Sequence, residues 1–223
     1  MQAGVVLLPR RRSRPNRRGW VGIVLPAAAL GGGILVLRAV SGGPHTLALV
    51  AAIATPVLAA ARPKWAPLAV GLWLIAWLAH GLVAQGAEVA LVALAAVTVA
   101  EIAGGLAPAW SLAAGLVALA ILDVVLVWGT RQVGPATTAL HHAAVPVAAG
   151  HPIPRLQDAT FGSATMGWLD FVAAALLGVV ARARVRAAVV TGIAAGAWGL
   201  LLLVTSTVPA TVPTLAGLLI GRL

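Results

Sequence analysis

Long apolar runs, separated by short polar or glycine- and proline-rich breaks, make up most of this chain. Because the runs are continuously apolar rather than alternating, they predict helices rather than β-strands. Runs of this length are typical of helices that cross a bilayer. The sequence therefore predicts an all-α polytopic membrane protein. About eight helices are expected, near residues 20–40, 45–61, 66–84, 87–104, 109–129, 164–181, 186–204 and 207–221.

The breaks between the runs divide the chain into three parts. Most breaks are short and contain glycine, proline or serine, such as those at 41–44 and 85–86. One long polar connection, at about 130–163, is the exception. We therefore expect a basic tail over 1–19, a four-helix membrane part over 20–108, and a C-terminal membrane part over 109–223 that contains this connection as an outer loop.

Composition and charge also indicate a membrane protein. Of the 223 residues, 61% are hydrophobic and only 9% are charged, which no soluble globular domain matches. The net charge is +10, but the basic residues gather in the first 18 residues and at the ends of apolar runs. If the N-terminus is cytoplasmic, 12 of the 15 Lys and Arg residues fall on the inner side, as the positive-inside rule requires. We expect a multi-pass protein of the cell membrane that contacts the lipid bilayer and no nucleic acid.

The other polar residues give little sign of cofactor chemistry. The chain has no cysteine, so disulfides, thiol catalysis and cysteine-bound metals are excluded. Three histidines of the long connection, His141, His142 and His151, lack acidic partners at metal-ligand spacing, and no metal or cofactor is expected. Glu88 and Glu101 are expected to reach the headgroup region from the ends of one helix. The spacing of Gly192 and Gly196 permits close helix packing, but it does not establish an oligomer.

Two aspartates stand alone inside apolar runs. Asp123 lies in the run 119–128 and Asp170 in the run 166–177. A charged side chain in hydrocarbon costs at least about 2.5–3.5 kcal/mol, so such residues usually have a function. In the predicted topology their two helices are antiparallel neighbours. Both carboxyls lie about 7–9 Å from the outer ends of these helices, at 1.5 Å per residue. The sequence therefore predicts a carboxyl pair at one depth.

A proline-rich segment opens the last predicted helix at the same depth. Pro209 and Pro213 each lack a backbone N–H, which loosens the first turns of the helix. Irregular backbone at membrane depth is tolerated where it is buried in protein or lines a cavity. Two aspartates and one irregular segment are therefore expected to meet.

In their order along the chain, these residues resemble the motifs of the presenilin and signal peptide peptidase family of intramembrane aspartyl proteases, which includes archaeal homologues. Leu122-Asp123, followed by Val127-Trp128-Gly129-Thr130, is similar to the family's Tyr-Asp motif. Gly167-Trp-Leu-Asp170-Phe is similar to its Gly-x-Gly-Asp motif. Pro209-Ala-Thr-Val-Pro213, or the overlapping Pro213-Thr-Leu215, is similar to its Pro-Ala-Leu-Pro motif. The likeness covers about residues 109–221, and Leu122, Leu169 and Thr211 depart from it.

The resemblance implies a presenilin-like helix bundle that hydrolyses transmembrane or signal peptides with a water activated by two aspartates. It implies that Asp123 and Asp170 are catalytic and that part 109–223 is the catalytic part. It also implies that an unfolded stretch of substrate pairs as a strand near the last helix. Six residues are expected to shape the active site or bind substrate: Gly167, Leu169, Pro209, Ala210, Pro213 and Leu215.

Other functions are compatible with two membrane-embedded aspartates. A small transporter can use them as a proton or cation site, although both acids lie on one hairpin and no repeat symmetry is visible. A prepilin-type peptidase also has a Gly-x-Gly-Asp motif, but polar and basic residues usually follow its aspartate, and Phe171-Val-Ala-Ala-Ala follows here. A catalytically inactive relative of the protease family is the remaining alternative.

Overall fold

The computed structural model describes residues 1–8, 20, 23–24, 43–129, 138–139, 142, 147–148, 151–154, 156–162, 164–205 and 208–221. In this part the chain is mostly helical, as predicted, and it has two small β-hairpins. The predicted helix at 20–40 lies almost wholly outside the described residues, as do the arginines at 10–18 and His141.

The helices agree with most of the predicted apolar runs. They are α1 (Gln2–Leu7), α3 (Gly43–Ala60), α4 (Ala66–Leu78), α5 (Gly81–Leu106), α6 (Ala109–Val124), α8 (Trp168–Val180), α9 (Arg184–Gly199) and α10 (Val212–Gly221). A π-helical turn, Val125–Gly129, extends α6, and a 3-10 turn, Leu200–Leu203, extends α9. The strands are β1 (Val147–Ala148), β2 (His151–Pro152), β3 (Asp158–Phe161) and β4 (Ala164–Gly167).

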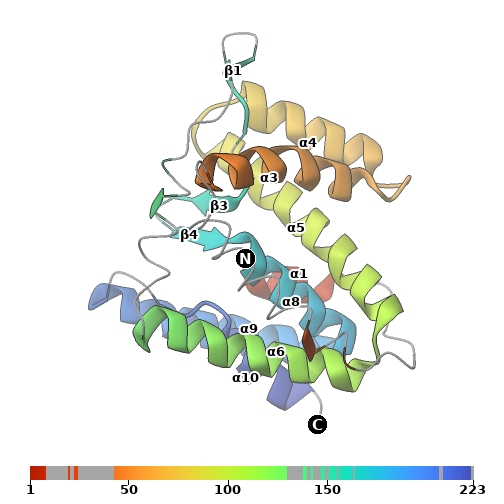
Figure 1. The fold of residues 1–223 in the computed structure, drawn as a ribbon, viewed down its shortest axis with the longest axis vertical. Helices are drawn as coiled ribbons and strands as arrows, with labels where there is room; N and C mark the ends of the chain where they lie inside the picture. Colours follow the sequence, from red (N-terminus) through yellow and green to blue (C-terminus); the bar gives the residue numbers. More distant parts are fainter. Residues whose placement is uncertain are drawn as a thin grey trace.

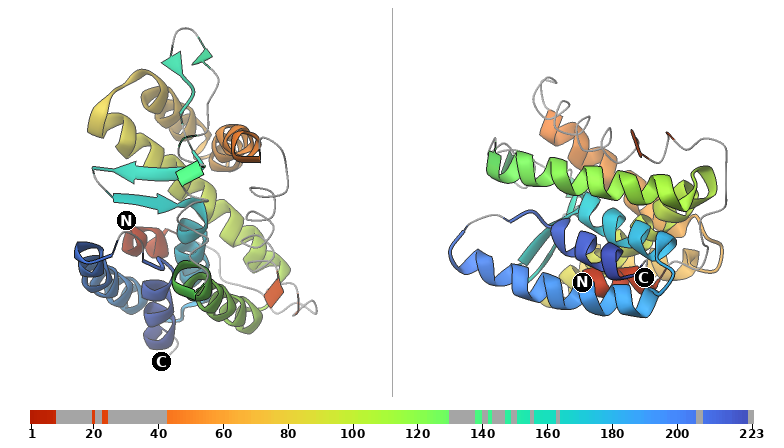
Figure 2. Two further views of the ribbon diagram at one scale, coloured as in Figure 1. Left: turned by 60° about the vertical axis from the view of Figure 1, so that its left-hand side comes forward. Right: turned by 90° about the horizontal axis from the view of Figure 1, so that it is seen from below.

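Helix α8 lies at the centre of the arrangement (Figure 1). All of its residues from Phe171 to Val180 are buried, because α1, α5, α6 and α10 pack around it. Helices α3 and α4 pack against α5 and not against α8, so they form a separate layer. Helix α10 lies between α6 and α9 in the right-hand view of Figure 2. The core is therefore a small bundle around α8.

Strands β3 and β4 form an antiparallel hairpin that leads directly into α8. The register pairs Phe161 with Ala164 next to the turn and Asp158 with Gly167 at the far end. Gly162 begins the turn with φ +63°, a conformation that glycine adopts at little cost. Its N–H donates to Gln85 Oε1 near the start of α5 at 2.9 Å, so the tip of the hairpin is tied to this helix.

Several predicted boundaries are wrong. The break between the third and fourth runs falls at 79–80, where Gly81 has φ +64° and starts α5; the predicted break at 85–86 lies inside α5. Residues 164–167 form a strand and not the start of a helix, and the predicted outer loop contains three further strands. Helix α10 begins five residues later than predicted, at Val212.

Among the described residues, two helices are long and apolar enough to cross a membrane, judged by length and composition. They are Gly81–Leu106 and Ala109–Gly129. Four more apolar helices have only 10–17 residues: Pro44–Ala60, Ala66–Leu78, Trp168–Val180 and Val212–Gly221. Length therefore supports two of the predicted crossings.

The first residues of the chain do not behave as the predicted basic tail. Residues 2–7 form α1, which packs against α8 and α9 and buries Gln2, Val5 and Val6. Apolar burial explains this placement, because the hexapeptide has no charge and two valines.

Glu101 has a partner that the sequence does not identify. It forms an ion pair with Arg62, which lies between α3 and α4, and the Arg62 guanidinium also stacks over the Trp65 ring at 4.1 Å. Glu101 therefore links the α3–α4 turn to the end of α5 and does not reach outward alone.

Candidate active site

Asp123 is held by a segment that follows it by almost ninety residues. It lies in the last turn of α6, and its side chain is buried. Its Oδ2 accepts a hydrogen bond from Thr211 Oγ1 at 2.7 Å and another from the Thr211 backbone N–H at 3.2 Å. Hydrogen bonds to an ionised carboxylate are stronger than those between neutral groups. The carboxylate therefore has a fixed orientation toward the start of α10.

Asp170 is held by the residue that precedes its helix. It is the third residue of α8, and its Oδ2 accepts a hydrogen bond from the Gly167 N–H at 3.1 Å. Such a bond caps the first turn of a helix. A Cβ at position 167 would lie 3.2 Å from the same Oδ2, so a larger residue there would crowd the carboxylate. Gly167 therefore shapes the surroundings of Asp170.

The two aspartates come from neighbouring helices. Helices α6 and α8 are in contact and run in opposite directions (Figure 1). Each is oriented by a backbone N–H, one from Thr211 and one from Gly167. Two carboxyls that lie close together in a medium of low dielectric do not both ionise readily, so such a pair can hold one proton. This arrangement can exchange a proton with a water or a substrate.

The proline-rich segment 208–211 is non-helical and completes the site. Pro209 is buried, and its carbonyl accepts a hydrogen bond from Trp198 Nε1 at 2.9 Å. Pro213 has no N–H to offer that carbonyl, as the fourth residue on would in a helix. The Ala210 carbonyl accepts from Gln2 Nε2 at 2.7 Å. Side chains from α9 and α1 thus replace the missing helical hydrogen bonds.

Most of the predicted site residues lie in this region. Asp123, Asp170, Gly167, Pro209 and Ala210 lie in or beside the interactions described above. Pro213 is buried in the first turn of α10, and Leu215, which is partly buried, packs against the core two residues further on. Leu169, which precedes Asp170, is half-buried.

Three residues of the site are absent from the sequence prediction: Thr211, Gln2 and Trp198. Thr211 takes the place of leucine in the Pro-Ala-Leu-Pro pattern. From sequence alone it is therefore interpreted as a departure from the family pattern and not as a hydrogen-bond donor to Asp123. Gln2 has a weak signal, as the single polar residue within an apolar hexapeptide. Trp198 reads as a residue near the end of an apolar run.

Metal ligands do not gather anywhere in the described part of the chain: it has no group of three or more His, Cys, Asp or Glu residues placed to hold an ion. His142 is a described residue, and it belongs to no such group.

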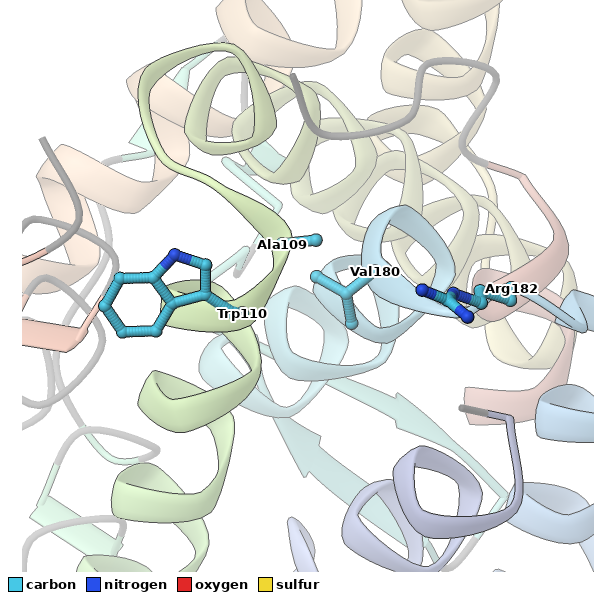
Figure 3. Close-up of a pocket in the computed structure, with 4 residues that line it drawn as sticks. All are labelled: Ala109, Trp110, Val180 and Arg182. Carbon is cyan, nitrogen blue, oxygen red and sulfur yellow. The ribbon is translucent and has the colours of Figure 1, made fainter. Parts of the chain in front are cut away.

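A hollow of about 390 Å³ lies elsewhere, between the start of α6 and the end of α8. Figure 3 shows its lining residues, Ala109, Trp110, Val180 and Arg182. Ala109 precedes Asp123 by fourteen residues, or about 21 Å along a helix at 1.5 Å per residue. The hollow is therefore separate from the two carboxylates.

No protein-family model, curated protein or solved structure matches this chain.

Proposed function

We propose that this protein is an intramembrane aspartyl protease, similar to the presenilin and signal peptide peptidase family, that hydrolyses transmembrane segments or signal peptides. The observation that supports the proposal is that Asp123 and Asp170 lie on two antiparallel helices in contact, each with its carboxylate held by a backbone N–H. Its catalytic part is 109–223. No metal or cofactor takes part in the proposed reaction.

In the proposed reaction, Asp123 and Asp170 share one proton. The ionised carboxylate removes a proton from a bound water as the water oxygen attacks the peptide carbonyl carbon, while the other carboxyl gives its proton to the carbonyl oxygen. The tetrahedral intermediate then collapses: the carboxyl that took the water proton gives it to the leaving nitrogen as the C–N bond breaks, and a hydroxyl of the intermediate gives its proton to the other carboxylate as the carbonyl re-forms. The pair therefore returns to its starting state.

The proposed setting is an eight-helix bundle in the cell membrane; the predicted cytoplasmic N-terminus is not part of the proposal, because Gln2 contacts Ala210 in the segment that holds Asp123. Gly81–Leu106 and Ala109–Gly129 are long enough to cross. Helices α8 and α10 are short, because β4 and segment 208–211 precede them at the level of the aspartates. Non-helical backbone at membrane depth is tolerated next to a cavity or within protein. The short helices are thus consistent with a place where water reaches the scissile bond.

Strand β4 is the proposed place for an extended stretch of substrate. Among the described strands it pairs only with β3, and Asp170 follows it by three residues. An unpaired strand edge offers backbone hydrogen bonds to another extended chain. A substrate strand added there would place a peptide bond close to Asp170, at the start of α8 and not beside the last helix as the resemblance implies.

The proposal is tested with the purified full-length protein in liposomes and a set of single-span helices carrying signal-peptide-like or transmembrane sequences. We expect cleavage inside the apolar segment, with two product peptides identified by mass spectrometry. Proton flux is measured in the same liposomes. If the substrates stay intact and a proton flux depends on the aspartates, the protein is a transporter and not a protease.

Thr211→Val is expected to lower kcat by about 10- to 100-fold with little change in KM. Valine has nearly the shape of threonine but cannot donate the 2.7 Å hydrogen bond to Asp123, and a hydrogen bond to a charged group contributes about 1.5–3 kcal/mol. Thr211→Ser is the matched control and should retain most of the activity. Equal kcat values for the Val and Ser variants would show that the hydroxyl does not serve the reaction.

A further inference from the structure

We infer that α1 belongs to the active site, with Gln2 acting as a positioning residue for Asp123 through the peptide group between Ala210 and Thr211. The inference rests on the proposed function and names an element of the same site that the family resemblance does not contain. It assigns a role to the first residues of the chain, which the sequence predicts to be a tail.

Helix α1 is held in place by packing. Gln2, Val5 and Val6 are at most 3% exposed, between α8 and α9. A Cβ at position 192 would lie 3.2 Å from the Ala3 Cβ, so the absence of a side chain at Gly192 lets α1 approach α9 closely. An isolated helix of six residues is unstable in water. The helix therefore exists because of these contacts.

Gln2 gives this packing a specific polar contact. A buried carboxamide is costly unless it is hydrogen-bonded, and Gln2 donates through Nε2 to the Ala210 carbonyl at 2.7 Å. The acceptor belongs to segment 208–211. The bond therefore joins α1 directly to the segment that holds Asp123.

One peptide group connects Gln2 to Asp123. The Ala210 carbonyl oxygen and the Thr211 N–H belong to the same planar unit and point in opposite directions. The oxygen accepts from Gln2 at 2.7 Å, and the N–H donates to Asp123 Oδ2 at 3.2 Å. Accepting a hydrogen bond at the oxygen polarises the amide and strengthens its N–H as a donor. Gln2 thus sets both the orientation of the unit and the strength of its bond to Asp123.

The first test compares Gln2→Met with Leu7→Ala. Methionine has a similar volume to glutamine but cannot donate, so we expect kcat to fall about 3- to 10-fold, the loss of one neutral hydrogen bond, with KM unchanged. Leu7 is on the same helix but is 51% exposed, and its truncation should change neither constant. Gln2→Met and Thr211→Val should lower kcat by less together than the product of their separate effects. An unchanged kcat, or effects that multiply, would overturn the inference.

A second pair of variants separates the hydrogen bond from the docking of α1. Because the chain has no cysteine, Ala3→Cys with Gly192→Cys introduces only one possible disulfide, at a Cβ separation slightly below the usual 3.5–4.5 Å. We expect the bond to form on mild oxidation, and Gln2→Met to lower kcat in this locked protein as well. Failure of the pair to cross-link would show that α1 is not docked against α9.

A readout that needs no activity distinguishes failure of this inference from failure of the proposed function. Hydrogen exchange at the Thr211 amide, measured well below the unfolding temperature, should be at least several-fold faster in Gln2→Met than in wild type or Leu7→Ala. This holds whether or not any substrate is cut. Unchanged exchange would exclude the link through the 210–211 peptide. Faster exchange in a protein that cleaves no substrate would support the link and contradict the proposed protease function.

Discussion

Asp123→Asn and Asp170→Asn are each expected to lower kcat for peptide-bond cleavage by about 10²–10⁴-fold, the usual contribution of a general acid or base. Asparagine has the shape of aspartate, and its Oδ1 can still accept the hydrogen bonds that Thr211 and Gly167 donate. It cannot gain or lose the proton that the reaction moves. The fold should therefore survive while the chemistry does not.

The measurement is product formation from a single-span helix in liposomes, together with thermal unfolding of each variant. Asp158→Asn is the matched control, because it makes the same chemical change on β3, and it should keep most of its activity. If Asp170→Asn still cleaves but unfolds at a lower temperature, Asp170 only caps α8, and the catalytic pair is excluded.

Gly217→Ala is expected to destabilise the protein by about 1–3 kcal/mol or more, the usual range for an overpacked core. A Cβ at 217 would lie 2.1 Å from Thr191 Oγ1, 2.8 Å from Leu177 Cδ2 and 2.9 Å from the Ala187 carbonyl oxygen. The threonine hydroxyl can rotate away, but the carbonyl belongs to the α9 backbone. Helix α10 must therefore move away from α9, and segment 208–211 would move with it.

Gly196→Ala is the control for this prediction. It is a helical glycine of α9 with nothing within 4 Å of the position of its missing Cβ, so alanine there should stabilise the helix by up to about 1 kcal/mol through its higher propensity. The two variants are compared by thermal unfolding in the same detergent. Equal unfolding temperatures would show that α9 and α10 are not packed as closely as described.

The helices that could be predicted from sequence are those whose apolar runs end at strong local signals. Helices α3 and α6 follow this rule, because Pro44 and Pro108 mark their starts. The break at 79–80 has no such signal: His80 and Gly81 sit within an apolar run, and the positive φ of Gly81 is visible only in the structure. The β3–β4 hairpin was missed because its short strands lie inside a polar connection that reads as a loop.

That Asp123 and the proline-rich segment lie together could be predicted, because their depth depends only on distances from helix ends. Which atoms hold Asp123 could not. The Thr211 hydrogen bonds join residues 88 positions apart, and the contact of Gln2 with Ala210 spans 208 positions. No local pattern encodes such pairs, because they depend on how α1, α6, α9 and α10 pack together.

The π-helical turn Val125–Gly129 makes the site sensitive to chain length. Such a turn accommodates one residue more than a regular helical turn. Removing one residue from it would leave the apolar character of the segment unchanged but rotate Asp123 relative to Trp128 by about 100°, one residue's share of a helical turn. The Trp128 ring lies 5.7 Å from the ring of Trp198, whose indole holds Pro209. During evolution, single-residue deletions here would thus be selected against even where most substitutions are neutral.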